Sequence, residues 1–245
     1  MHNMPVRKKL SDEVRLRLEE MIRDEVYPVG ASLPSERDLM SMFDVGRPSV
    51  REALFALEKM GLVRINSGER PKVTRPTPRN MLEQLTGTAH LLMDQPDGIG
   101  HFEQLRLFLE VSIARHAAEM ASRQQVDALA AALAENERAI PRARAFAVTD
   151  VAFHRVLTAI PGNPIFLAAH EALVEWLINQ RIHMANTEVE NRRSFAGHKS
   201  VFEAIERHDP EAAGKAMREH LENARRKFNP GPANVTPTIS PDRSR

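Results

Sequence analysis

The 245-residue chain contains no cysteine, which excludes a disulfide scaffold, a thiolate zinc finger and a cysteine nucleophile. Aromatic residues make up only 5% of the chain, and strand-like alternation is rare beside helical periodicity. No apolar run approaches the roughly 18–20 residues that span a bilayer, and the basic N-terminus lacks the apolar segment of a secretory signal. These absences predict a mainly helical, cytoplasmic protein.

The chain also has almost no excess of charge of either sign, since its formal net charge is +1. Its distribution is uneven, however. Residues 47–75 carry seven Lys and Arg against three Asp and Glu, a local excess of +4, whereas residues 76–245 carry 20 against 21. Since 245 residues suffice for two domains, the sequence predicts a basic N-terminal head and a nearly neutral body.

Residues 6–75 predict three short helices and a hairpin. Ser11 is expected to cap the first helix and Ser35 the second, SERDLMSMF. Pro48 suits the first turn of the third, RPSVREALFALEKMG, which ends at Gly61. LVRI and PKVTR then flank Asn-Ser-Gly-Glu, a hairpin pattern. Two short helices, a tight turn and a two-stranded wing form a winged helix-turn-helix, whose second helix enters the major groove of DNA.

The third predicted helix presents arginines at its N-terminal end, and a guanidinium can bond O6 and N7 of one guanine together. The preceding helix and the wing tip add further candidates for contacts to bases or phosphates. The predicted DNA contacts are Arg37, Arg47, Ser49, Arg51, Gly68 and Arg70. A solvated helix face is the alternative interpretation. The coincidence of helix spacing, wing and local charge favours binding to double-stranded DNA.

Residues 76–80 (PTPRN) predict a linker, and residues 81–228 a helical body. Ser122 with Gln125 has the pattern of a capping box, and Asp209 precedes a proline suited to the first helical position. The tail, residues 229–245, has four prolines and few core-forming residues, which predicts disorder. The helices of the body are expected at 81–94, 99–120, 123–138, 144–159, 164–185, 190–207 and 210–228.

Four residues with metal-binding side chains are expected to face the interior of the body: Asp150, His154, His198 and His220. The first two are spaced i,i+4 along one apolar stripe, and the other two lie in or beside the apolar arcs of later helices. A buried carboxylate is costly when unpaired, and a divalent ion with neutral imidazoles would compensate it. Zn²⁺ suits this set, with Ni²⁺ or Mn²⁺ as alternatives. The other interpretation is a group of hydrogen-bonded core histidines.

The segment LPSERDLMSMFDVGRPSVREALFALEKMGLV resembles the DNA-binding motif of the GntR superfamily, especially its FadR-type subgroup. In that family three arginines at the positions of Arg37, Arg47 and Arg51 touch operator DNA. The body resembles the FCD ligand-binding domain, whose metal-binding members use an Asp-x-x-x-His pair and two later histidines. The resemblance implies a winged helix-turn-helix, an all-helical antiparallel bundle that binds metal through the four residues above, and a nucleoid-associated homodimer.

The same resemblance implies a carboxylate effector that binds beside the metal. Arg106 matches the pocket arginine of the family and could hold a carboxylate bidentately; a salt bridge with Glu103 or Glu110 is the alternative. Asn163 either borders the pocket or only shapes its turn. His170 either lines the pocket or packs in the core, and packing is the interpretation we favour.

Further segments, among them GIGHFEQLRLFLE and DVAFHRVLTAIPGNPIF, resemble the sialic-acid-catabolism repressors of this subgroup. They imply repression that N-acetylneuraminate releases, whereas glucuronate, gluconate or lactate are effectors of relatives with the same scaffold. A metal-dependent enzyme is the competing class. It is disfavoured because no clear general base accompanies the cluster and a DNA-binding head would be unexplained. A purely structural zinc site is a third alternative.

Overall fold

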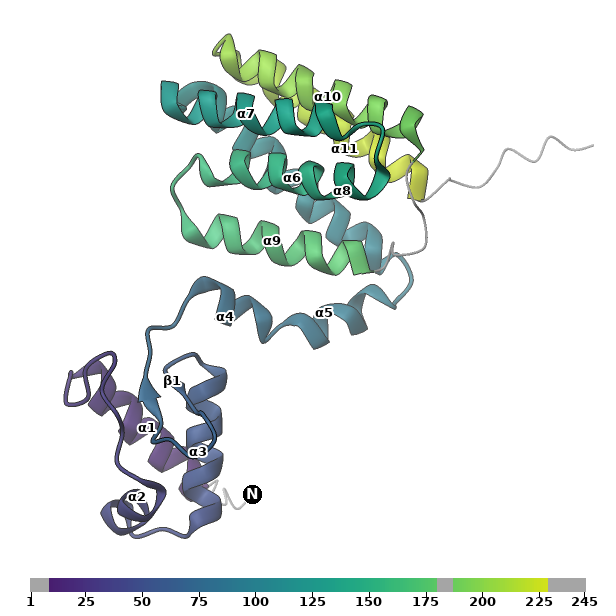
Figure 1. Ribbon diagram of the computed structural model, residues 1–245. Helices are drawn as coiled ribbons and strands as arrows, with labels where there is room; N and C mark the ends of the chain where they lie inside the picture. Colours follow the sequence, from purple (N-terminus) through teal and green to yellow (C-terminus); the bar gives the residue numbers. More distant parts are fainter. Residues whose placement is uncertain (1–8, 180–186, 229–245) are drawn as a thin grey trace, which may run out of the picture. The chain divides into compact units, whose positions relative to one another are not determined.

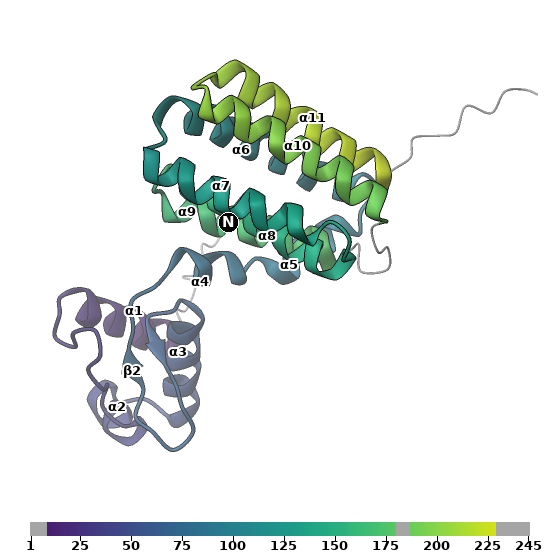
Figure 2. The ribbon, with the colours of Figure 1, turned by 45° about the horizontal axis from the view of Figure 1, so that its top comes forward.

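The computed structural model describes residues 9–179 and 187–228. The chain divides into two compact units, with the division between Ala89 and His90. Each unit has its own buried apolar core, and Figures 1 and 2 show the helices of each.

The N-terminal unit is a small helical domain with a two-stranded antiparallel sheet, in which Val63 pairs with Val73. Both valines face the core, together with apolar residues of all three helices such as Leu18, Leu39 and Leu57. Its elements are α1 (Leu10–Arg23), α2 (Glu36–Phe43), α3 (Arg47–Lys59), β1 (Val63–Arg64) and β2 (Lys72–Val73). The predicted winged helix-turn-helix is therefore confirmed.

Local signals explain where the head helices begin and end. The Ser35 side chain accepts from the Asp38 backbone N–H in a capping box, so Ser35 caps α2 as predicted. Gly61 has φ +72°, a left-handed conformation that glycine adopts easily, and it directly follows the α3 C-cap. The prediction for Ser11 was wrong, because α1 already begins at Leu10 after Lys9, and Ser11 is buried within the helix.

Two short helices follow the wing, where a linker at 76–80 and one helix at 81–94 were expected. Thr77 caps α4 (Pro78–Glu83) through a capping box with Asn80. A short break separates it from α5 (Thr86–Met93). The first helical turn of α4 thus lies inside the predicted linker range.

The C-terminal unit is a bundle of long helices. Consecutive helices pack in pairs, α7 with α8 and α10 with α11, and α11 also packs along α6, as the two ribbon views show (Figures 1 and 2). The helices are α6 (Gly98–Met120), α7 (Arg123–Ala139), α8 (Ala143–Ala159), α9 (Pro164–Asn179), α10 (Glu188–Glu206) and α11 (Pro210–Phe228). The mainly helical fold class is therefore confirmed.

The predicted apolar stripe of α8 forms the centre of this bundle, since Phe153 and Leu157 are fully buried against Leu129 of α7 and Met217 of α11. The capping box at Ser122 is present, and Asp209 Oδ1 accepts from a backbone N–H of the first turn of α11. The end of the helix predicted at 164–185 and the predicted disordered tail lie outside the described residues. Among the residues described, no helix has the length and apolar character of a membrane span.

Candidate functional site

The N-terminal end of α3 presents the predicted DNA-contact arginines to solvent. Arg47 and Arg51 are both about two-thirds exposed and share the carboxylate of Glu36 on α2. Arg51 Nε donates to Glu36 Oε1 at 2.9 Å, and Arg47 Nε lies 3.9 Å from Oε2. Exposed ion pairs of this kind contribute little stability, so both guanidinium groups are available to exchange the carboxylate for phosphate or base.

The other predicted DNA contacts are also at the surface of the head. Arg37 and Arg70 are exposed. The pKa of Asp38 is lowered mainly by its hydrogen bond with Ser35, and the charges of Arg37 and Arg70 lower it further. Gly68 at the wing tip has φ +78° and open space around its Cα. Ser49 is half-buried in the first turn of α3. The four predicted arginines thus lie around two carboxylates of α2, Glu36 and Asp38.

Three predicted metal ligands converge inside the bundle, each from a different helix. His154 (α8), His198 (α10) and His220 (α11) are buried, and the three rings can offer nitrogen atoms within 4.8 Å of one another. His154 Nε2 lies 3.2 Å from the Nε2 atoms of both His198 and His220. The sequence prediction that these three residues share one site agrees with this arrangement.

This spacing matches the coordination shell of a divalent ion. Nitrogen ligands at about 2.0–2.1 Å from a tetrahedral zinc ion would lie about 3.3 Å from one another. Without a cation, three imidazole nitrogens that face one point can form hydrogen bonds with one another only where one of them carries a proton. The donor set therefore fits a metal ion, and three neutral imidazoles suit zinc or nickel.

Asp150 lies at the border of this histidine cluster. Its Oδ1 is 3.5 Å from His198 Nε2 and accepts a hydrogen bond from Ser194 Oγ at 3.0 Å. The carboxylate remains 28% exposed, so it approaches the cluster from its solvent side. Asp150 is not among the residues whose ligand atoms all lie within 4.8 Å of one another, so the structure brings together three of the four predicted ligands.

Both His198 and His220 are held in the neutral form that metal binding requires. Burial is the main cause that lowers the pKa of each ring well below its usual value, and repulsion from neighbouring histidines adds to it. His198 Nδ1 lies 2.9 Å from Asn136 Oδ1, while the Asn136 amide donates to Thr149. The Asn136 oxygen therefore accepts the Nδ1 proton, which leaves the Nε2 lone pair of His198 facing the cluster.

A buried ionic network adjoins the cluster on the side of α6. Glu110 is 1% exposed, and its Oε2 lies 2.5 Å from His154 Nδ1. Its Oε1 accepts from Arg106 Nε at 2.5 Å and lies 3.3 Å from His170 Nε2. Burial raises the pKa of Glu110, but the charges of Arg106 and His154 outweigh it and bring the pKa well below its usual value. Glu110 is therefore an ionised carboxylate inside the bundle.

Glu110, His154 and His170 also group closely enough to suggest a second metal site. The Arg106 guanidinium already occupies Glu110 Oε1, and its positive charge opposes a cation there. Proximity to Glu110 raises the pKa of Arg106 against the lowering effect of burial. The group is consequently better described as the surroundings of His154 than as a separate metal site.

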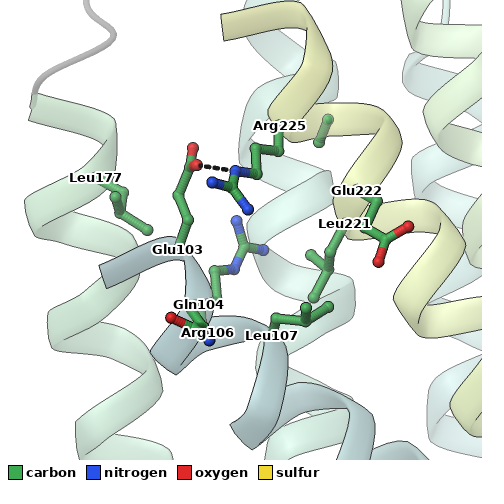
Figure 3. Close-up of a pocket in the computed structure, with 9 residues that line it drawn as sticks. Glu103, Gln104, Arg106, Leu107, Leu177, Leu221, Glu222 and Arg225 are labelled. Carbon is green, nitrogen blue, oxygen red and sulfur yellow. Dashed lines mark ion pairs between the residues drawn. The ribbon is translucent and has the colours of Figure 1, made fainter. Parts of the chain in front are cut away.

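Arg106 also lines a small cavity between α6, α9 and α11, which Figure 3 shows. The cavity has a volume of about 60 Å³. Glu103 and Arg225 form an ion pair at 3.2 Å across it, and the Arg106 guanidinium points into the space beside them. The histidine cluster does not line this cavity, but Glu110 connects the two by contacting both Arg106 and His154.

The remaining candidates have local partners. Asn163 Oδ1 accepts from the Ile165 backbone N–H at 2.9 Å and does not line the cavity. His170 is 1% exposed beside Glu110, in agreement with the packing interpretation. Sequence reasoning considered Glu110 only as a surface partner of Arg106 and did not single out Asn136. The sequence signal that could have identified both residues is a polar side chain on an apolar helix face, Glu110 on α6 and Asn136 on α7.

The comparisons with known proteins agree with both units. Residues 10–85 match the family of bacterial regulatory proteins, gntR family, and residues 102–223 match the FCD domain. The HTH-type transcriptional repressor NanR of Enterobacter sp. (strain 638) is 50% identical over 217 residues, which cover 88% of this chain and 84% of that protein. The chain belongs to the GntR family. Its FCD body is consistent with the FadR-type subgroup of these GntR regulators.

Two further GntR-type relatives support this assignment. The repressor NanR of Escherichia coli (strain K12) is 50% identical over 88% of this chain and 82% of its own length. The structure of Streptococcus agalactiae GntR is similar with a TM-score of 0.60 and 28% identity, covering 89% of this chain and 99% of that one. The NanR relatives are named transcriptional repressors and the matched family consists of bacterial regulatory proteins, so this chain is a DNA-binding regulator and not an enzyme, as the sequence predicted.

Proposed function

We propose that this regulator is a homodimeric repressor that a sugar acid, N-acetylneuraminate, releases from its operator. The relatives that are half identical to it are named as NanR repressors, and its sequence resembles the repressors of sialic acid catabolism. The observation that carries the sensor part is the convergence of three histidine Nε2 atoms beside the buried Arg106–Glu110 pair.

Operator binding would use the exposed end of the head. A helix-turn-helix protein reads two half-sites through two recognition helices, so dimerisation of the body would fix their separation. Arg47 and Arg51 would contact base edges, while Arg37, Ser49, Gly68 and Arg70 would contact phosphate or the groove beside the wing. Phosphate contacts set salt-dependent affinity, whereas base contacts determine the sequence.

The body would bind both metal and effector. His154, His198 and His220, with Asp150, would hold a divalent ion, with Zn²⁺ favoured over Ni²⁺ or Mn²⁺. Such an ion supplies a Lewis acid with positions open to an anionic oxygen. Arg106 would bind the effector carboxylate through the guanidinium nitrogens that Glu110 does not use. Asn163, at the start of α9, lies away from the cavity, which α9 lines through Leu177 near its other end; its predicted contact with the effector therefore has no support from the cavity lining.

Effector binding would also change the shape of the body. Small-molecule sites commonly enclose about 300–1,000 Å³, whereas the cavity beside Arg106 has about 60 Å³. A sugar acid would therefore stabilise a state in which α6, α9 and α11 are further apart. An effector shifts a conformational equilibrium only when it binds one state better, and this difference in cavity size supplies such a preference.

A thermal-shift experiment tests the proposal. Zn²⁺-loaded protein is melted with N-acetylneuraminate, glucuronate, gluconate or lactate, and again after chelation. We expect a rise in Tm with N-acetylneuraminate that chelation abolishes, because a ligand that binds the native state stabilises it. A rise with another acid would change the effector, and bound Zn²⁺ without any response would indicate a structural metal site.

Arg106→Lys refines this test. Lysine keeps a positive charge beside Glu110 but loses the bidentate fork, so the Tm rise should shrink while Zn²⁺ still binds. Arg115→Lys is the matched control, since Arg115 lies on the same helix and pairs with the exposed Glu211. An undiminished response in Arg106→Lys would contradict the carboxylate-binding role.

A further inference from the structure

The carboxylate of Glu110 contacts both the histidine cluster, through His154, and the cavity arginine, Arg106. It lies 2.5 Å from His154 Nδ1 through one oxygen and 2.5 Å from Arg106 Nε through the other. We propose that Glu110 is a positioning residue that orients His154 for metal binding and couples metal affinity to anion binding at Arg106. This inference rests on the proposed function of the body.

The first half of the proposal concerns the tautomer of His154. A neutral imidazole carries its proton on one nitrogen and a lone pair on the other. An ionised carboxylate beside Nδ1 favours the tautomer with the proton on Nδ1, which leaves the Nε2 lone pair directed at His198 and His220. Metal-binding histidines commonly have such a carboxylate or carbonyl partner, and its removal costs metal affinity.

A parallel arrangement at His198 supports this interpretation. There the Asn136 oxygen lies 2.9 Å from Nδ1, and the Asn136 amide group is committed to Thr149. Two of the three clustered rings thus have a side-chain oxygen within 2.9 Å of Nδ1, although only the Asn136 oxygen meets the geometry of a hydrogen bond there. The acceptor at His154 differs because it is charged and is shared with Arg106.

The second half concerns this sharing. A guanidinium has five N–H donors. Arg106 donates to Glu110 through Nε, and its side chain also lines the cavity. An anion in the cavity would compete with Glu110 for the charge of Arg106. Glu110 would then interact more strongly with His154, and metal affinity would rise. Because coupling between two binding sites is reciprocal, bound metal would raise anion affinity by the same factor.

Glu110→Gln tests the first half, with Glu119→Gln as the control for the loss of one negative charge. Glu119 is an exposed carboxylate near the other end of the same helix and does not line the cavity. Zn²⁺ affinity of the full-length protein is measured by competition with a chromophoric chelator. We expect Glu110→Gln to weaken Zn²⁺ binding roughly 10- to 100-fold and Glu119→Gln to leave it within a factor of about two.

Two readouts separate positioning from general structural damage. Nitrogen-edited NMR of the metal-free protein reports the imidazole tautomers, and the Nε2–H tautomer of His154 should appear only in Glu110→Gln. If this variant does not fold, the charge-neutral pair Arg106→Gln/Glu110→Gln is measured instead, since it removes both buried charges together. The same loss of Zn²⁺ affinity and the same tautomer change are expected.

The coupling is measured as the ratio of Zn²⁺ affinities with and without saturating N-acetylneuraminate. We expect a ratio above one in the wild-type protein that falls in Glu110→Gln and persists in Glu119→Gln. Unchanged Zn²⁺ affinity and an unchanged tautomer in Glu110→Gln, or an unchanged ratio, would overturn the inference while leaving the proposed metal site intact. A wild-type protein that binds no Zn²⁺ would overturn both.

Discussion

Glu36 Oε1 lies 2.9 Å from Arg51 Nε, so a carboxylate of α2 holds an arginine at the start of the helix expected to read DNA. Glu36 is about one-third exposed and Arg51 about two-thirds. In this environment the pair contributes little to stability. Its position instead affects binding, because Glu36 places a negative charge where phosphates are expected to approach.

Glu36→Gln should therefore strengthen DNA binding without sequence preference. Removing the negative charge frees Arg51 and Arg47 and lowers repulsion of phosphate, which we expect to raise affinity for random duplex DNA roughly two- to five-fold. Fluorescence anisotropy at several salt concentrations measures the change. Glu20→Gln, which removes a carboxylate paired with Arg17 on α1, controls for net charge, and an equal gain there would contradict the local explanation.

Arg51→Ala should reduce sequence discrimination more than overall affinity. If Arg51 contacts a base edge, its loss should cost about 1–3 kcal/mol of preference for the operator over random DNA. The operator is first selected from a random duplex library with the wild-type protein, and both affinities are then compared. Arg17→Ala removes an exposed arginine elsewhere on the head and should leave the preference unchanged. Equal losses on both DNAs in Arg51→Ala would indicate a phosphate contact instead.

The head could be predicted from sequence because its signals are local. Ser35 with Asp38, and the glycine after α3, define helix ends within a few residues of chain. Ser11 was misassigned because a capping residue and a residue of the first helical turn are alike in type. What decided the boundary was the extended backbone of Lys9 and the burial of Ser11.

The histidine cluster was predictable because each ring follows the apolar periodicity of its own helix. Glu110 was not, since a carboxylate four residues after an arginine is typical of an exposed helix pair. Its burial depends on His154 and His170, which come from two other helices and lie far along the chain. Helical periodicity carries no information about such a partner.

The metal-free body should lose stability as the pH falls below about 6.5. Burial lowers the folded-state pKa of His198 and His220, whereas the unfolded chain protonates both rings near their ordinary pKa. The unfolded state then binds more protons, so acid favours it, by at most about 2.7 kcal/mol per pH unit for two groups.

Urea unfolding of chelated protein between pH 7.5 and 5 measures this slope by circular dichroism. The double variant His198→Asn/His220→Asn should show a much flatter profile in the same range, which separates the histidines from other titrating groups. A wild-type free energy of unfolding that stays constant from pH 6.5 to 5 would contradict the assignment of neutral, buried rings.

Gly197→Ala should weaken metal binding through contact between two helices. A Cβ on Gly197 would lie 2.5 Å from His220 Nδ1 and 3.0 Å from His220 Cβ, so the ring and its attachment to α11 would have to move. The ligand geometry would then be disturbed, and we expect Zn²⁺ affinity to fall roughly 10- to 100-fold. Gly100→Ala is the control, because the added Cβ on α6 would meet only Arg225 Nη2, at an ordinary contact distance of 3.5 Å. Alanine also favours helix over glycine by about 1 kcal/mol, so Gly100→Ala should keep both fold and Zn²⁺ affinity. The Zn²⁺ affinity of both variants is measured by competition with a chelator. Equal affinities would contradict the prediction, because α10 and α11 would then separate without moving the His220 nitrogen.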